Sequence, residues 1–545
     1  MTYRARGATD RAPGAKGHTT VRGRWTAAAV AALLAATTAV ATSQASGSAA
    51  APIPAAAPPA RPNVVLVLTD DQDLSLNRFM PQTRKLVRQR GLSFSNYVVN
   101  TSLCCVARSS LLRGQYAQNT HVENNVPPEG GFLRYHQEGL DTNDLPVWLD
   151  QLGYTTSMEG KYLNGYPSVE GSGPYAGQGV GRLDIPVGWD DWFSPVGGTP
   201  YSEFNYVMND NGVERSYGSA NRDYLTDVLA DRAVQFLDQQ AGADSPFFLY
   251  LAPYAPHSPY KPPPRYRDFL KRDRLKVPRT KDFDEKSISD KPSPLSKLHP
   301  LTAKDKKRLD KIYRKRAASV RGVDDMVADV VAALSANGQL DNTYIFVTSD
   351  NGYHLGQHRM PPGKYTPYES DIRLPLFVRG PGVPEGGTSA QLTSNIDLAP
   401  TIVDLAGGRA PSFVDGVSFA PWLSASPPGG QLRRTLLLER KISTFVGGPL
   451  ARGRMDLGEP RDPRLLEQLD FHATPYRGVR SADGYTYVLY ADGQEELYDL
   501  HRDPYQLRNL LGRGQTVSGA TFQRLRELRR DLSSLTGCAG ASCHQ

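Results

Sequence analysis

The sequence lacks a membrane-spanning apolar run, a cysteine near the N-terminus that could carry a lipid, and an internal repeat. The apolar stretch from Ala27 to Ala41 is short and rich in alanine, so it is a poor membrane anchor. Because it follows a basic segment and precedes small residues suited to cleavage, it predicts a secretory signal peptide over residues 1–45. The Ala/Pro-rich residues 46–61 are expected to form a flexible leader. We therefore expect a secreted, extracellular protein with no membrane anchor.

The sequence also lacks a strong net charge once the signal segment is set aside. The whole chain has 63 lysines and arginines against 56 aspartates and glutamates, and the first 41 residues hold six of the former and one of the latter. The remaining balance of 57 to 55 gives no indication of a nucleic-acid partner. Basic charge is concentrated in Lys261–Arg316, with twenty basic against eight acidic residues. This run is either a solvated surface or a guide for a polyanionic substrate such as a sulfated glycan.

Apolar runs alternate with segments of helical periodicity over residues 62–425. Continuous apolar runs of this kind are typical of parallel strands buried on both faces. The pattern predicts an α/β fold, with a large mixed, mostly parallel central sheet flanked by helices. Residues 258–305, rich in proline and charge, are expected to cross the surface irregularly. The expected strands are 63–71, 153–161, 247–252, 344–349 and 374–379, and the expected helices are 80–89, 145–152, 224–239, 306–333 and 397–406.

A smaller C-terminal α+β subdomain is expected over residues 426–545, where the texture of the sequence changes. Short alternating runs are separated here by the turns Asp483-Gly484 and Asp492-Gly493, which favours an antiparallel sheet. A helix is expected after the last strand. The predicted strands are 476–481, 486–490 and 495–500, and the predicted helix is 521–535.

The four cysteines fall into two pairs with different expected roles. Cys538 and Cys543, in a tail of small residues, most simply form a local disulfide in an oxidising compartment. Cys104 and Cys105 are adjacent, and adjacent cysteines rarely bond to each other because the short loop strains disulfide geometry. They begin a segment that suits a helix, whose N-terminus favours an anionic ligand. They are either buried small apolar side chains, or one of them is modified.

Polar oxygens follow two of the predicted strands directly. Asp70 and Asp71 end the first strand, and Asp350 and Asn351 end the strand at 344–349. If the two strands are neighbours, three carboxylates converge and repel one another unless a cation neutralises them. All-oxygen ligands suit a hard ion, and an irregular, protein-rich site favours Ca²⁺ over Mg²⁺. The alternative is a strand-end turn at Asp350 and a helix cap at Asp70 or Asp71.

The segment Cys104–Arg108, of sequence CCVAR, with Gly114 after it resembles the signature of the sulfatase family. That signature reads Cys-x-Pro-x-Arg and places a glycine six residues after the arginine. In this family a formylglycine-generating enzyme oxidises the cysteine to formylglycine (3-oxoalanine), whose hydrate is the nucleophile. The resemblance implies that Cys104 is the converted residue, and Val106 stands where the family has proline. It also implies one Ca²⁺, bound by Asp70, Asp71, Asp350, Asn351 and the modified residue 104.

The resemblance extends to four residues that bind substrate or transfer a proton in the family. Lys161, in Gly-Lys-Tyr-Leu-Asn, matches a lysine that binds the sulfate or the formylglycine diol. Lys364 matches the second sulfate-binding lysine. His257, between prolines, matches the histidine that contacts the ester oxygen, and His354 is expected to contact the substrate or the leaving group. The positive side chains, with Arg108 and the cation, would offset the charge of the sulfate.

The resemblance covers about Asn63 to Leu510 and implies an alkaline-phosphatase-like sulfatase. Its motifs are most similar to those of glucosamine-6-sulfatases and the extracellular heparan endosulfatases. The expected substrate is therefore a sulfated amino sugar or glycosaminoglycan, such as N-acetylglucosamine 6-sulfate, or an aryl sulfate. Two alternatives stay open. One is a phosphodiesterase or phosphonate monoesterase of the same superfamily, and the other is a catalytically silent protein that binds sulfated glycans.

Overall fold

The computed structural model describes residues 61–167, 180–293, 295–441, 474–517 and 519–545. The predicted signal peptide and nearly all of the predicted leader lie outside the described residues. All described residues belong to one compact unit, so the division predicted at residue 425 stays a prediction. Among the described residues, no helix combines the length and the apolar character needed to cross a membrane.

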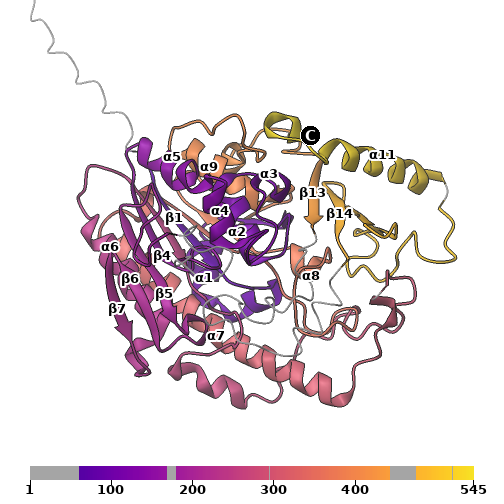
Figure 1. Ribbon diagram of the computed structural model, residues 1–545, viewed down its shortest axis with the longest axis horizontal. Coiled ribbons are helices and arrows are strands. Elements are labelled where there is room, and N and C mark those ends of the chain that lie inside the picture. Colours follow the sequence, from indigo (N-terminus) through magenta and orange to yellow (C-terminus); the bar gives the residue numbers. More distant parts are fainter. Residues whose placement is uncertain (1–60, 168–179, 294, 442–473, 518) are drawn as a thin grey trace, which may run out of the picture. The chain divides into compact units, whose positions relative to one another are not determined.

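Ten strands form one mixed sheet (Figure 1). They are β1 (Asn63–Thr69), β2 (Leu92–Phe94), β4 (Thr155–Gly160), β5 (Asp191–Gly198), β6 (Tyr206–Asp210), β7 (Val213–Tyr217), β8 (Phe247–Ala252), β9 (Thr343–Ser349), β10 (Leu376–Arg379) and β11 (Gly387–Ser389). Their order is β11-β2-β10-β9-β1-β8-β4-β5-β6-β7. Neighbouring strands are parallel from β9 through β1, β8 and β4 to β5. The next pair on each side, β10 with β9 and β6 with β5, is antiparallel. The predicted α/β fold with a mixed, mostly parallel sheet is confirmed.

Helices cover both faces of this sheet, which explains the continuous apolar run of β1. The α-helices before the small C-terminal sheet are α1 (Pro81–Thr83), α2 (Cys104–Arg113), α3 (Ala117–Thr120), α4 (Gly131–Gln137), α5 (Leu145–Gln151), α6 (Leu225–Gln239), α7 (Ala303–Ala336), α8 (Glu369–Ile372) and α9 (Leu398–Leu405). Val65 and Val67 of β1 pack in a cluster with α6 and α7. Val64 and Leu66 point the other way and pack in a cluster with α2, α5 and α9.

The main sheet differs from the prediction in three features, the first of which is that β2 and β11 lie where no strand was expected. Strands β5, β6 and β7 extend the sheet where no strand was expected, although Asn211-Gly212 between β6 and β7 is a typical hairpin turn. The exposed polar side chains of β7 gave no apolar run to find. Strand β10 pairs antiparallel with β9, and an apolar run does not distinguish the two strand directions.

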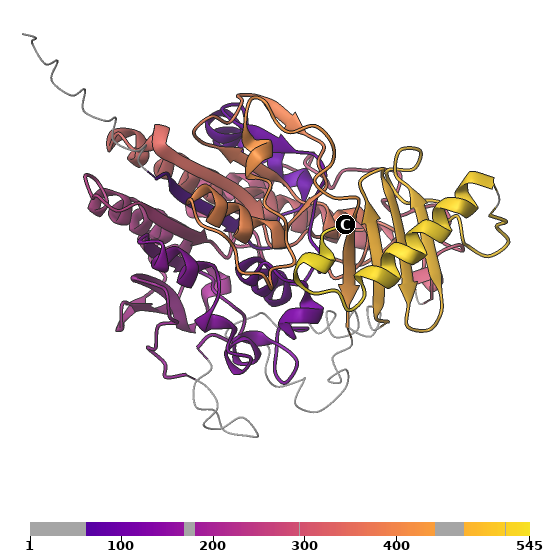
Figure 2. The same cartoon turned by 90° about the horizontal axis from the view of Figure 1, so that it is seen from above.

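A separate antiparallel sheet follows the main one, with order β13-β14-β15-β16. Its strands are β13 (Thr435–Arg440), β14 (Tyr476–Ser481), β15 (Tyr485–Tyr490) and β16 (Glu495–Asp499), and β13 was not expected. Helix α11 (Gly519–Leu535) lies along one face of this sheet (Figure 2). Cys538 and Cys543 form the predicted disulfide, and Cys104 and Cys105 are buried thiols outside it.

Candidate active site

The ends of β1 and β9 bring four polar side chains together. The two strands are parallel neighbours in register from Asn63 to Thr69, so the residues after them emerge at the same edge of the sheet. Asp71 N donates a hydrogen bond to Asp350 Oδ1 at 3.1 Å, and Asn351 Nδ2 donates to Asp71 Oδ1 at 2.6 Å. Asp71 has a φ of 67°, which is uncommon for a non-glycine residue and turns the chain sharply after the strand.

Cys104 begins helix α2 and faces this cluster. Its Sγ lies 3.3 Å from Asp70 Oδ1 and 3.9 Å from Asp71 Oδ1. The next residue, Cys105, packs in the core, and its N–H, which has no partner within the helix, donates to Asn125 Oδ1 at 3.0 Å. Val106 is also buried in the first helical turn, where a proline is tolerated because no intrahelical N–H is needed.

Three cationic side chains are inserted among the carboxylates. Lys161 Nζ lies 2.7 Å from Asp70 Oδ2, and Arg108 Nε lies 2.8 Å from Asp350 Oδ2. Lys364 Nζ lies 2.5 Å from Asp71 Oδ1 and 2.6 Å from Cys104 Sγ. Lys161 and Arg108 are buried, whereas 13% of the Lys364 side chain is exposed. The site therefore combines alternating charges with one cation open to solvent.

Gly160 determines how Lys161 enters the site. Its φ is +103°, and a Cβ atom at this position would lie 2.2 Å from the carbonyl oxygen of Ala252 on β8. Only glycine fits this close approach. Because β4 ends here, Lys161 N donates to the same carbonyl at 2.7 Å and its side chain turns toward Asp70.

Burial and neighbouring charges shift the pKa values in this cluster, downward for Asp70 and upward for Asp350 and Cys104. Burial alone would raise the pKa of Asp70, but the positive charge of Lys161, added to those of His257, Arg108 and Lys364, outweighs it and holds that pKa well below its usual value. Burial and the neighbouring Asp70 charge raise the pKa of Asp350. Burial, followed by Asp70, raises the pKa of the Cys104 thiol well above its usual value. An unmodified Cys104 is therefore a protonated thiol and a weak nucleophile.

The two predicted histidines lie in different surroundings. His257 Nε2 is 3.5 Å from Asp71 Oδ2, at the edge of the cluster, and its Nδ1 is 2.9 Å from the carbonyl oxygen of Ser258. His354 is fully buried, and its Nδ1 lies 2.9 Å from Asp371 Oδ1. The structure thus brings His257 to the cluster, while Nδ1 of His354 is directed to Asp371.

The cluster has the composition of a metal site. One ligand atom from each of Asp70, Asp71, Cys104 and His257 lies within 4.8 Å of the others, and all four residues are buried. Asn351 Oδ1 is also buried and accepts no hydrogen bond from any described residue. Buried polar atoms are nearly always satisfied, so this oxygen is suited to a cation. Carboxylate and amide oxygens are ligands for Ca²⁺ or Mg²⁺.

Comparison with known proteins agrees with this arrangement. The family model described as Sulfatase matches residues 62–408. An N-acetylglucosamine-6-sulfatase from Capra hircus is 36% identical over 503 residues, covering 89% of this chain and 85% of the relative. The chain belongs to the sulfatase family. As a sulfatase it is an enzyme that hydrolyses sulfate esters.

Solved structures share the fold of this sulfatase. A structure described as a complex with its substrate D-glucosamine-2-N,6-O-disulfate has a TM-score of 0.63 and 21% identity, covering 87% of this chain and 97% of its own. A phosphonate monoester hydrolase from Silicibacter pomeroyi has a TM-score of 0.60 and 23% identity, covering 86% and 93%. Both similarities concern the fold, which serves sulfate and phosphonate esters alike.

Three further residues support the sulfatase site, and two of them, Arg316 and Asp371, have no distinguishing pattern in the sequence. Arg316 falls in the basic run, yet it is fully buried and donates to the Asp71 carbonyl at 2.6 Å and to Asp73 Oδ2 at 2.8 Å. Asp371 accepts hydrogen bonds from the N–H and hydroxyl of Thr366, two residues after Lys364. Asn125 holds the start of α2. Arg316 stands among other charged residues, so nothing in the sequence marks it as buried.

Proposed function

We propose that this sulfatase uses formylglycine formed from Cys104, with a divalent cation at Asp70, Asp71, Asp350 and Asn351. The proposal is supported chiefly by the contact of Cys104 Sγ with both a carboxylate and the Lys364 ammonium. When present, formylglycine supplies the nucleophile and the cation supplies positive charge beside the sulfate oxygens. Ca²⁺ is the proposed ion because the ligand oxygens come from irregular loops after two strands.

The chain's own residues carry the remaining steps. Cys104 Sγ stands at the position of an oxygen on Cβ of residue 104, and Asp70, 3.3 Å away, can orient a hydroxyl there by accepting its hydrogen bond. Lys161, Lys364 and Arg108 hold positive charge around the same point, which reduces the repulsion between a sulfate and an approaching anion. These groups are ordered before substrate arrives, so little reorganisation accompanies the reaction.

His257 is the proposed proton donor to the departing alcohol. A carbonyl oxygen only accepts hydrogen bonds, so the Ser258 carbonyl keeps a proton on Nδ1; the proton given to the alcohol must then come from Nε2 of the doubly protonated ring, the nitrogen that faces the cluster. His354 is proposed to contact the substrate or the leaving group, oriented by Asp371. Protonation of the leaving oxygen lowers the barrier for breaking its bond to sulfur.

The proposed substrate is a sulfated amino sugar such as N-acetylglucosamine 6-sulfate. The identity to the Capra hircus enzyme over most of both chains supports this choice. Secretion is proposed as well, because the basic and apolar N-terminal segment has the pattern of a signal peptide and a disulfide joins Cys538 to Cys543.

Steady-state kinetics with matched esters test the proposed function. The wild-type enzyme is expected to hydrolyse N-acetylglucosamine 6-sulfate with a kcat/KM at least about 100-fold above that for the corresponding phosphate. A phosphate diester and a phosphonate monoester are measured alongside. If the kcat/KM for either exceeds that for the sulfate ester, the chain is a phosphodiesterase or phosphonate monoesterase instead. The variant Lys364→Met, which keeps an unbranched side chain one atom shorter but removes its charge, should lose about 100-fold or more.

A further inference from the structure

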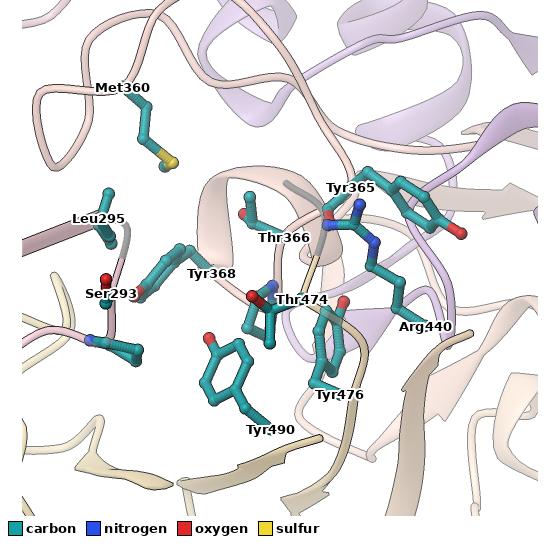
Figure 3. A pocket seen from close by; sticks show the side chains of 12 residues that line it. Ser293, Leu295, Met360, Tyr365, Thr366, Tyr368, Arg440, Thr474, Tyr476 and Tyr490 are labelled. Carbon is teal, nitrogen blue, oxygen red and sulfur yellow. The ribbon is translucent and has the colours of Figure 1, made fainter. Parts of the chain in front are cut away.

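The small C-terminal sheet contributes three neighbouring side chains to a cavity. Arg440 pairs with Tyr476 across β13 and β14, and Tyr476 pairs with Tyr490 across β14 and β15, so the three form one cross-strand row. With Tyr365 they line a cavity of about 40 Å³. Figure 3 shows the Tyr476 ring directed toward the Arg440 guanidinium, with Tyr490 beside it.

Arg440 has no anionic partner in the part of the chain that the structure describes. Its Nη1 donates to the carbonyl oxygen of Tyr365 at 3.3 Å, and its Cζ lies 4.1 Å from the centre of the Tyr365 ring. Burial lowers the pKa of Arg440, and the tyrosines around it offset this only in part. A partly buried guanidinium with aromatic and carbonyl neighbours alone gains from pairing with an anion.

Tyr476 provides a second polar group with no partner. Only 3% of the residue is exposed, and its hydroxyl makes no hydrogen bond with any described residue. Tyr368 and Tyr490 also line the cavity, but their hydroxyls both donate hydrogen bonds to Glu496. A buried hydroxyl beside a partly buried cation is the donor set that an anionic oxygen requires.

The cavity adjoins the catalytic cluster through two links. Tyr365 and Thr366, which line it, directly follow Lys364, whose Nζ contacts Cys104 Sγ. Ser102, two residues before Cys104, donates its hydroxyl to the Thr366 carbonyl at 3.2 Å. Consecutive Cα atoms are about 3.8 Å apart, so the backbone at Tyr365 places one wall of the cavity next to the backbone of Lys364.

The size of the cavity selects among anions. One water needs about 10–15 Å³ of such volume, so 40 Å³ accommodates about three non-hydrogen atoms. A carboxylate has three, whereas a sulfate group has five atoms or more. The cavity therefore fits a carboxylate better than a second sulfate.

We propose that Arg440 and Tyr476 form a subsite for a carboxylate on the sugar next to the sulfated one. This inference rests on the proposed function, and it makes the substrate an acidic, sulfated oligosaccharide in which a uronic acid adjoins the amino sugar. The carboxylate accepts hydrogen bonds from the guanidinium and from the Tyr476 hydroxyl, which satisfies both groups at once.

The test compares Arg440→Gln and Tyr476→Phe with wild type on three substrates. These are N-acetylglucosamine 6-sulfate, a 6-sulfated disaccharide with an adjoining uronic acid, and the same disaccharide with its carboxyl group reduced to an alcohol. Each variant should lose about 10- to 100-fold in kcat/KM on the acidic disaccharide and less than about 2-fold on the other two. The matched control is Arg477→Gln, since Arg477 follows Tyr476 on β14 and points to the opposite face of the sheet.

An equal loss on all three substrates, or no loss on the acidic one, would overturn the subsite. Calorimetric binding of the same disaccharides separates this failure from failure of the proposed function. If no sulfate is released, the subsite still requires the wild type to bind the acidic disaccharide at least about 10-fold more tightly than the reduced one, with the difference absent in Arg440→Gln. The same binding measurement can be made with a doubly sulfated disaccharide. If its affinity depends on Arg440 and that of the uronic acid disaccharide does not, the choice of a carboxylate is wrong.

Discussion

Arg108 and Asp350 form an ion pair in which neither side chain is exposed to solvent, with Arg108 Nε 2.8 Å from Asp350 Oδ2. The same guanidinium donates through Nη1 to the Lys161 carbonyl at 2.7 Å. One side chain of α2 thus contacts the residues that follow β9 and β4. Because Cys104 lies one turn earlier on the helix, this pair also fixes where Cys104 faces the cluster.

The variant Arg108→Lys should fold and lose at least about 100-fold in kcat/KM. Lysine keeps the charge but offers a single nitrogen, so it cannot bond Asp350 and the Lys161 carbonyl with the same geometry. The measurement is steady-state hydrolysis of a sulfate ester together with thermal unfolding. The control Arg90→Lys alters an exposed ion pair with Glu385 and should change neither quantity appreciably. Activity of Arg108→Lys within about 3-fold of wild type would show that the bidentate contact is unnecessary.

The adjacent cysteines should respond differently to the same substitution. Cys104→Ala is expected to abolish turnover, because Cys104 Sγ lies in the cluster against Asp70 and Lys364. Cys105→Ala should keep most of the activity and cost about 1–2 kcal/mol of stability, since Cys105 packs in the core. Turnover numbers and unfolding midpoints of both variants check this. The opposite result would move the nucleophile to Cys105.

The cation can be tested without relying on activity. Asn351→Leu replaces the unpartnered amide oxygen with a methyl group of similar size, so the folded enzyme should lose bound Ca²⁺ in elemental analysis. Chelation should lower the Tm of the wild type by several degrees and leave that of Asn351→Leu unchanged. The control Asn342→Ala lies just before β9, at the opposite end of the strand, and should retain the metal. An equal metal content in both variants would contradict the assignment.

Glu439 should make stability depend on pH. Burial is the largest cause that raises its pKa from 4.5 to about 7, so the folded state holds a proton that the unfolded state releases. Its contribution to stability is complete below about pH 4.5 and is lost as the pH rises through about 7, a change of about 3 kcal/mol. Glu439→Gln should therefore gain about that much relative to wild type between pH 4.5 and 7.5.

Denaturant unfolding at the two pH values measures the Glu439 effect. The control Glu385→Gln changes an exposed carboxyl, and its difference from wild type should stay below about 1 kcal/mol at both pH values. A constant difference between Glu439→Gln and wild type would mean that Glu439 has an ordinary pKa in the folded protein.

The parts of the site that follow apolar strands were accessible from the sequence. Asp70 and Asp350 each stand directly after a strand that is buried on both faces, and such strands are readable because burial on both sides produces a continuous apolar run. That β1 and β9 are neighbours was not readable. The two strands are far apart in sequence, and their pairing depends on how helices pack over the sheet.

The residues that hold the site in place were not predictable. Arg316 belongs to a run of charged residues that is mostly exposed, and only the packing of α7 against the loop after β1 makes it a buried donor to Asp71. Asp371 accepts a hydrogen bond from the N–H of Thr366, and tertiary contacts set the path of the chain between these two residues. Strand β13 was missed because its partner β14 follows only after a long stretch of sequence, so no hairpin turn marks it.

The mass of the peptide Gly91–Arg108, from enzyme produced in a host that makes formylglycine, tests the central claim most directly. Replacement of the elements of H₂S in Cys104 by oxygen, located by fragmentation, is the predicted result. It would establish the proposed nucleophile with valine at position 106. Two intact thiols in enzyme that still hydrolyses sulfate esters would contradict the account, because turnover would then proceed without formylglycine.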